Sequence, residues 1–332
     1  MSNLLDIKDL VVEYRSEDGI AHAVNGMTFS LETGDTLGLV GETGAGKTTT
    51  ALSILRLIQS PPGKIVSGEI SFEGEDLLQV SEAQMRKIRG KEIAMIFQDP
   101  MTALNPVIPV CDQVAEVLHQ HFDISKVEAS EKALKMLEKV GIPASRGGNY
   151  PHQFSGGMKQ RVVIAIALAC MPKLIIADEP TTALDVTIQA QILEMMRQLK
   201  EESGTSIILI THDLGVVAET CDKVAVVYAG EVVEYGNLEH IFDFTSHPYT
   251  QCLFDALPSL DKKVDMLTPI EGQMFDPLTP PDGCKFHPRC PRATKECACT
   301  VPPVVSVQEG HTVRCLYAQE IFAAKEATAN AK

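Results

Sequence analysis

The alternation of apolar and polar residues predicts strands in the first third of the chain. Residues 4–13 and 25–32 alternate in the way expected of antiparallel strands with one buried face. The stretch TLGLV, at 36–40, is typical of a short buried strand, and a glycine-rich turn and a helix over about 46–58 follow it. Two further strand-like stretches occupy residues 68–73 and 92–97.

The middle of the chain changes to helical spacing and then alternates between the two patterns. Residues 112–140 have helical periodicity, and a helix begins near Ser155. After them we expect a strand at 173–178, a helix at 187–202, a strand at 205–210 and a helix after His212. This order predicts a parallel sheet flanked by helices, with an all-helical insertion between about 99 and 170.

The composition changes after Gly236, where prolines and glycines repeatedly interrupt any regular secondary structure. We expect one domain over residues 1–236, a join near 236–258, and a small loop-rich module within 237–332 that ends in a short helix. A module of this size usually needs a staple, because its core is too small to hold it folded.

Composition excludes several classes of protein. The net charge of −15 argues against a general nucleic-acid binder, which needs clustered Lys and Arg. The longest apolar run, residues 162–171, is ten residues, about half of what a membrane-spanning helix needs. The charged residues in the first apolar run argue against a signal peptide. We therefore expect a soluble protein whose nine cysteines stay reduced and whose membrane role, if any, depends on partners.

The octet GETGAGKT, residues 41–48, matches the phosphate-loop pattern G-x-x-x-x-G-K-[ST] and lies between a predicted strand and a predicted helix. The glycines let backbone N–H groups face a phosphate, and the helix adds its positive N-terminal end. Lys47 is suited to bridge the β- and γ-phosphates, and the Thr48 hydroxyl to ligate Mg²⁺.

An acidic pair ends the buried stretch LIIADEP, where Asp178 and Glu179 follow four apolar residues. Asp178 is then placed to hold Mg²⁺, and Glu179 to act as a general base for an attacking water. In a chain without a phosphate loop, the pair would be read as a solvated cap on the next helix.

The residues between these motifs resemble ABC ATPases. The stretch FSGGMKQR, at 154–161, is similar to the LSGGQ-type signature of that family, and it precedes Asp178 at the expected distance. TTALD, ending at Asp185, resembles the family's dimer-contacting loop. The resemblance implies a P-loop ABC ATPase fold: a RecA-like parallel-sheet core with an antiparallel β subdomain and a helical subdomain.

The same resemblance assigns roles by position. Tyr14 would stack on adenine, Gln98 would contact Mg²⁺, and His212 would reach the γ-phosphate as a second catalytic residue. The signature would act in trans on the nucleotide of the other subunit of a head-to-tail dimer. The expected Mg²⁺ ligands are Thr48, Gln98 and Asp178. The expected ATP-binding residues are Tyr14, Gly41, Glu42, Thr43, Gly44, Ala45, Gly46, Lys47, Thr48, Thr49 and Gln98, with Ser155, Gly156 and Gly157 in trans.

Three stretches narrow the resemblance to the ATPase subunits of bacterial dipeptide, oligopeptide and nickel importers: QDPMTALNPVIPV, HPYTQCLFDALP and GCKFHPRCP. It implies a second ATPase subunit (a distinct paralogue, hence a heterodimer), two membrane permeases and an extracytoplasmic binding protein, with this chain on the cytoplasmic face of the membrane. The expected activity is ATP hydrolysis that powers peptide import. A nickel or other solute importer, or a soluble ABC ATPase outside transport, is the alternative.

The C-terminal cysteines follow a spacing found in this family, C-x5-C-x6-C-x17-C, at Cys284, Cys290, Cys297 and Cys315. Four thiolates suit either a [4Fe–4S] cluster or Zn²⁺. The wide gaps favour the cluster, and unligated thiols remain a third option. We expect an iron–sulfur site here, with structure or redox chemistry as its purpose.

Overall fold

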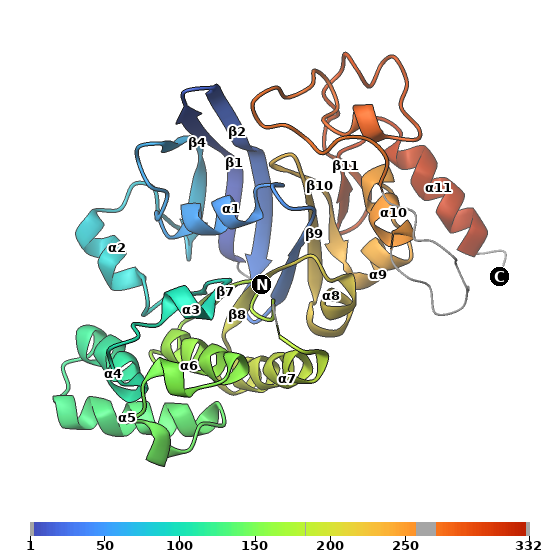
Figure 1. Ribbon diagram of the computed structural model, residues 1–332. Coiled ribbons are helices and arrows are strands. Elements are labelled where there is room, and N and C mark those ends of the chain that lie inside the picture. Colours follow the sequence, from blue (N-terminus) through green and yellow to red (C-terminus); the bar gives the residue numbers. More distant parts are fainter. Residues whose placement is uncertain (1–2, 183, 257–269, 330–332) are drawn as a thin grey trace. The chain divides into compact units, whose positions relative to one another are not determined.

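The computed structural model describes residues 3–182, 184–256 and 270–329. The chain divides into two compact units. The first consists chiefly of residues 31–36 and 79–210, and the second of residues 4–30, 37–78 and 211–332. Figure 1 draws both units, coloured along the chain.

The first unit is built on three parallel strands. They are β6 (Ile93–Ile96), β7 (Leu174–Asp178) and β8 (Ser206–Thr211), and β7 pairs with both of the others. Every residue of β7 is buried, which is why its first four residues are all apolar rather than alternating with polar ones. This confirms the parallel strands predicted for this part of the chain.

Helices make up the rest of the first unit. Two short 3₁₀ turns, at Ala144–Arg146 and Pro151–Gln153, accompany them. The helices are α2 (Glu82–Ile88), α3 (Pro100–Ala103), α4 (Val110–His121), α5 (Lys126–Lys139), α6 (Gly156–Leu168) and α7 (Val186–Ser203). The predicted helical stretch at 112–140 is two helices, because Phe122 is extended and Ser125 accepts a hydrogen bond from the Glu128 N–H as the N-cap of α5.

The second unit contains a four-stranded antiparallel sheet in the order β2-β1-β4-β5. Its strand β1 alternates between buried and more exposed positions, as the sequence pattern predicts for a sheet with one covered face. The strands are β1 (Asn3–Ser16), β2 (Gly19–Glu32), β4 (Gly63–Phe72) and β5 (Glu75–Asp76).

A second set of strands in this unit surrounds β9. Strand β3 (Thr36–Val40) runs parallel to β9 (Lys223–Tyr228), and β10 (Glu231–Asn237) pairs with β9 in the antiparallel sense. The C-terminal strands β12 (His311–Val313) and β11 (Val305–Gln308) continue from β10. The pattern analysis did not predict β9 or β10, which form a hairpin whose two turn residues, Ala229 and Gly230, both have positive φ.

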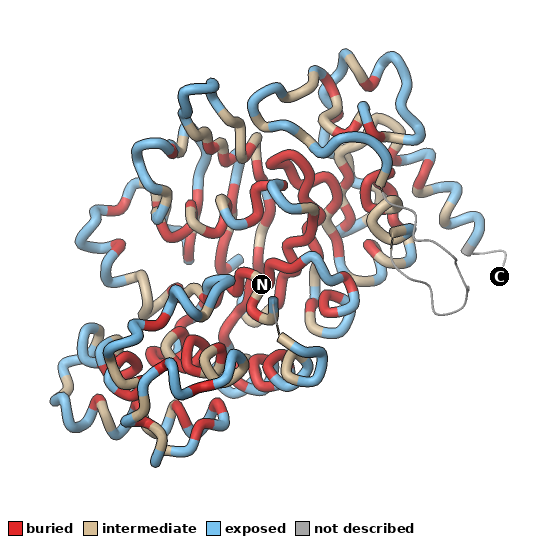
Figure 2. The backbone as a smooth tube through the Cα atoms, viewed as in Figure 1, coloured by how far each residue is buried: buried red, intermediate tan, exposed pale blue. Residues whose placement is uncertain are grey.

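The helices of the second unit are few and short, and Figure 2 shows that its buried residues gather mainly in the strands. A 3₁₀ turn, His287–Arg289, interrupts the loops between residues 270 and 304. The helices are α1 (Lys47–Ile54), α8 (Leu214–Thr220), α9 (Leu238–Phe242), α10 (Pro248–Asp255) and α11 (Ala318–Ala329). No helix among the described residues is long and apolar enough to cross a membrane. Part of the expected join near 236–258, residues 257 and 258, lies outside the described residues.

Candidate ATP-binding and hydrolysis site

The phosphate loop lies between β3 and α1, as predicted, and two of its glycines, Gly41 and Gly46, are required by close approach of the backbone. A Cβ on Gly41 would lie 2.1 Å from the Val227 carbonyl oxygen, and one on Gly46 would lie 2.5 Å from that of Ala23. Gly46 also has a φ of 97° and is the N-cap of α1. A loop that tolerates no side chain at these positions keeps its backbone N–H groups accessible to a phosphate.

Lys47 is folded against the loop that contains it. Its Nζ donates hydrogen bonds to the carbonyl oxygens of Gly41 (2.6 Å) and Glu42 (2.9 Å), and the side chain is buried. A buried ammonium beside the backbone N–H groups of a helix N-terminus is a donor set that fits the phosphates of a nucleotide. Thr48, the expected Mg²⁺ ligand, is exposed, and Thr49 is half-buried.

Glu42 has two contacts that the sequence did not reveal. Its backbone N–H donates to the Tyr249 hydroxyl, and its carboxylate accepts two hydrogen bonds from the Arg289 guanidinium. Both partners lie in stretches that carried the family resemblance, but no spacing rule links positions more than 200 residues apart. The sequence assigned neither residue a role.

The acidic pair is in the first unit, at the end of β7. Asp178 is buried, with 3% of its surface exposed. Glu179 has a positive φ of 47°, an uncommon conformation for a residue with a side chain, and its Oε2 accepts hydrogen bonds from Gln98 Nε2 (2.9 Å) and Thr182 Oγ1 (2.8 Å). The structure thus brings Gln98 and Glu179 together, two residues that the sequence singled out separately.

The signature residues open helix α6. Ser155 is its N-cap, accepts a hydrogen bond from the Met158 N–H and is exposed. A Cβ on Gly157 would lie 2.6 Å from Ile188 Cγ2, so the start of α6 and the start of α7 need the glycine to pack. Asp185 caps α7 by accepting from the Ile188 N–H at 2.9 Å. An exposed helix N-terminus with glycines beside it is suited to bind an anion.

Two remaining residues lie in the second unit. Tyr14 is half-exposed on β1, and His212 is exposed just after β8. Exposure leaves both side chains available to a ligand, but it does not assign them one. Their roles, like those of the other site residues, stay predictions.

The structure contradicts the metal site that the cysteine spacing predicts. Cys284, Cys290, Cys297 and Cys315 line one cavity, but its volume is about 20 Å³, comparable to a single water molecule. Among the described residues, no group of three or more His, Cys, Asp or Glu side chains could hold a metal ion. The expected [4Fe–4S] cluster at these four residues is therefore wrong, and the described residues offer no zinc site either.

The thiols have a physical reason to stay protonated. Burial raises the pKa of Cys284 to about 11 and also raises the pKa of Cys290 and of Cys315. Neutral buried thiols behave as small apolar groups. Cys299, which lies outside the spacing of these four cysteines, is exposed.

Comparison with known families gives two matches. Residues 24–182 match the family described as ABC transporter, and residues 233–297 match the family described as oligopeptide/dipeptide transporter, C-terminal region. The second match spans Tyr249 and Arg289.

Known relatives cover nearly the whole chain. The oligopeptide transport ATP-binding protein OppD of Bacillus subtilis is 50% identical over 95% of this chain and 88% of its own length. The OppD protein of Escherichia coli is 48% identical over 94% of this chain and 92% of its own length. These names mention ATP binding and oligopeptide transport and no iron–sulfur cluster.

Solved structures agree on the fold. A dimeric ATP-binding cassette, bound to ADP and Pi in a post-hydrolysis state, is 28% identical, with a TM-score of 0.64 over 70% of this chain and 98% of that chain. The P-loop ABC ATPase fold with mixed α/β sheets, expected from the motifs, is confirmed. The chain belongs to the ATP-binding proteins of ABC transporters, in the family that carries the oligopeptide/dipeptide transporter C-terminal region.

Proposed function

We propose that this chain is the ATP-hydrolysing subunit that powers import of dipeptides and oligopeptides through an ABC transporter. The observation that carries the proposal is that two family matches and relatives at about half identity agree over nearly the entire chain, including its C-terminal region. The nickel, other-solute and non-transport alternatives are not favoured, since these relatives are named for oligopeptide transport.

In this proposal the second unit binds the nucleotide phosphates. N–H groups of the phosphate loop and the Lys47 ammonium contact the β- and γ-phosphates, while Tyr14 stacks on the adenine. His212, exposed just after β8, orients the γ-phosphate. The buried position of Lys47 supports its assignment, because a cation held on loop carbonyls is already placed for an anion.

The first unit supplies the groups for hydrolysis. Of the Mg²⁺ ligands expected from the sequence, Gln98 and Asp178 belong to this unit and Thr48 to the second, and the ion would offset the phosphate charge when bound. Glu179 accepts the proton of the attacking water as general base. Gln98 Nε2 and Thr182 Oγ1 both donate to its Oε2, and they hold the carboxylate in a fixed orientation. The positive φ of Glu179 stores strain of the kind found at functional sites.

The proposal includes partners. The exposed N-terminus of α6, with Ser155, Gly156 and Gly157, caps the nucleotide of a second cassette, a distinct paralogue, in a head-to-tail dimer. Two permeases and an extracytoplasmic binding protein complete the importer, with this chain on the cytoplasmic face. Residues 1–236 form the nucleotide-binding domain, with the helical subdomain at about 99–170, and residues 237–332 form the C-terminal module. The acidic net charge of −15 goes against a nucleic-acid partner.

Reconstitution tests this proposal. The purified chain is expected to hydrolyse ATP slowly, and faster when its partner cassette, the permeases and a peptide-loaded binding protein are present. Full activity of a strictly monomeric chain, with no increase on assembly, would contradict it.

A further inference from the structure

Glu42, the second residue of the phosphate loop, is held at each of its polar groups. Its N–H donates to the Tyr249 hydroxyl at 3.0 Å, and its carbonyl oxygen accepts from Lys47 Nζ at 2.9 Å. Its carboxylate accepts from both terminal nitrogens of Arg289, at 2.6 and 3.0 Å. Two of these three attachments come from the region after residue 236.

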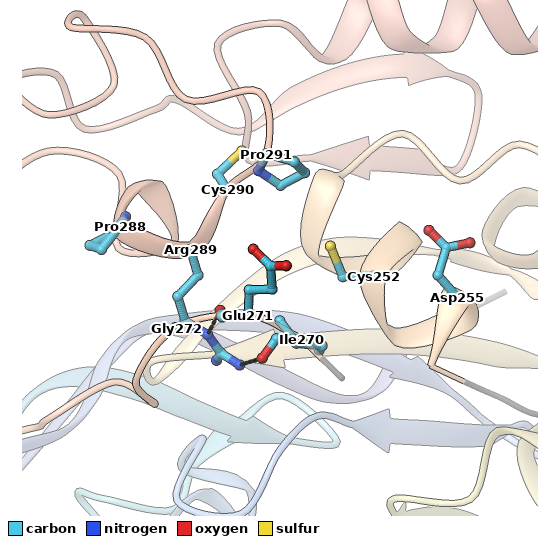
Figure 3. Close-up of a pocket in the computed structure, with 9 residues that line it drawn as sticks. All are labelled: Cys252, Asp255, Ile270, Glu271, Gly272, Pro288, Arg289, Cys290 and Pro291. Carbon is cyan, nitrogen blue, oxygen red and sulfur yellow. Dashed lines mark hydrogen bonds between the residues drawn. The ribbon is translucent and has the colours of Figure 1, made fainter. Parts of the chain in front are cut away.

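The Arg289 side chain is buried more deeply than the arginine of an ordinary ion pair on a protein surface. Only 3% of its side chain is exposed, against 23% for that of Glu42. Its remaining donors are used as well: Nε donates to the Glu271 carbonyl and Nη2 also donates to that of Ile270, as Figure 3 shows. The pKa of Arg289 is raised, chiefly by its hydrogen bonds to Glu42. A two-pronged pair of this kind fixes geometry as well as charge.

Aromatic packing supports the same contact from behind. Phe286, three residues before Arg289, packs edge-on against Tyr228 and Tyr249, with ring centroids 5.1 and 5.3 Å apart. The Arg289 guanidinium lies over the Tyr228 ring at 5.9 Å. The 3₁₀ turn that carries Arg289 is itself fixed, because the His287 N–H donates to the Cys284 carbonyl. This turn, within the cysteine-containing stretch 283–300, is therefore a rigid support for the phosphate loop.

Charge explains why the loop needs this support. A phosphate loop receives a polyanion, and an unpaired carboxylate within it would repel that anion. Pairing with a guanidinium removes most of the repulsion and keeps the carboxylate turned to Arg289. Removing one partner of a buried pair leaves the other charge without compensation, which costs more than the pair itself contributes.

We propose that Arg289, with Tyr249, is a positioning residue for nucleotide binding: the ion pair with Glu42 neutralises and orients the phosphate loop, so ATP affinity depends on the C-terminal segment. This inference rests on the proposed binding of ATP by the loop. It assigns Arg289 no contact with the nucleotide, and its effect is on binding rather than on the chemical step.

The test compares ATP binding and turnover of the full-length chain and its variants, by titration with ATP in the presence of EDTA and by steady-state hydrolysis with Mg²⁺. R289M is expected to raise Kd and KM for ATP at least about tenfold, which corresponds to about 1.4 kcal/mol, with kcat within about twofold of wild type. R292M, which removes an exposed arginine of the same segment, is the matched control and is expected to bind as wild type does.

A second variant separates charge from folding. E42Q/R289M removes the unpaired carboxylate and is expected to bind ATP more tightly than R289M alone, a rescue that a merely structural arginine would not give. Tyr249→Phe keeps the ring, deletes the hydroxyl contact and is expected to weaken binding about fivefold. Should R289M lose its fold, this variant still carries the test.

The outcomes are distinct. Wild-type affinity in both R289M and Tyr249→Phe, or a double variant that binds no better than folded R289M, would overturn the inference while the proposed function stands. Absence of ATP binding by the wild-type chain would overturn the proposed function itself.

Discussion

Two glutamates next to the proposed ATP chemistry have opposite surroundings. Glu179, at the end of β7, accepts hydrogen bonds from an amide and a hydroxyl, which orient its carboxylate. Glu42, in the phosphate loop, accepts from a buried guanidinium. Arg289 engages both carboxylate oxygens of Glu42, whereas the amide and the hydroxyl both donate to one oxygen of Glu179. The surroundings, rather than the residue type, separate a group suited to chemistry from one suited to positioning.

Of the two glutamates, Glu179 is the one whose substitution should have the largest effect. Glu179→Gln should lower kcat by about 1,000-fold, because the amide cannot accept the proton of water, while the loop still binds ATP. Steady-state hydrolysis and nucleotide titration measure the two effects. Glu194→Gln, an exposed change on α7, is the control. Near-normal turnover of Glu179→Gln would remove the base assignment.

The next effect concerns the nucleotide of the partner cassette. Ser155→Arg should reduce hydrolysis about 100-fold at the site whose phosphate loop belongs to the other subunit, because the bulky side chain blocks the anion site at the start of α6. Vanadate trapping of labelled nucleotide, followed by separation of the two chains, shows which loop is affected. A defect confined to this chain's own loop would mean that the signature acts in cis.

The loop itself can be tested by adding one methyl group. Gly46→Ala should destabilise the fold by about 2 kcal/mol, because the Cβ meets the Ala23 carbonyl oxygen in a left-handed backbone conformation. Gly44→Ala is the matched control: its φ is also positive, but nothing lies within 4 Å of the new Cβ, so about 1 kcal/mol is expected. Urea unfolding measures both, and equal losses would show that close packing does not constrain Gly46.

Acid should weaken the support behind the loop. Burial lowers the pKa of His247 to about 3, so between that value and the unfolded pKa of about 6.5 the unfolded state binds a proton that the folded state does not. Stability is then fully present above about pH 6.5 and falls by about 1.4 kcal/mol per pH unit below it. Urea unfolding at pH 7 and pH 5 should show the loss in wild type and a smaller one in His247→Gln. An equal loss in both would place the acid sensitivity elsewhere.

The smallest effect is expected from metal removal. Dialysis against EDTA, without nucleotide, should leave the thermal unfolding and the protease resistance of residues 283–315 unchanged, since the cavity that the four cysteines line has room for about one water. Loosening of this segment on chelation would reinstate a metal site.

The sequence predicted the features that neighbouring residues determine. It did not predict those that depend on residues far apart in the chain. Gly41 to Thr48 are neighbours in the chain and lie where strand and helix patterns placed them, so the loop was predictable. The β9–β10 hairpin was missed because both strands are buried on both faces, so their residues do not alternate between apolar and polar, and β10 even buries Glu231 and Glu234. The cysteine spacing suggested a metal cluster, which was wrong, because the space between the four thiols is set by the surrounding side chains and not by the spacing. The pair of Arg289 and Glu42 joins residues 247 positions apart, and only the folded chain brings them together.

Peptide uptake tests the central claim most directly. The importer, assembled with this chain, is reconstituted in vesicles that contain ATP and Mg²⁺, and a labelled tripeptide with its binding protein is supplied on the opposite face. The account predicts uptake that requires ATP and disappears when this chain carries Glu179→Gln. Uptake that continues at the wild-type rate with that variant, or ATP hydrolysis with no peptide transport, would contradict it.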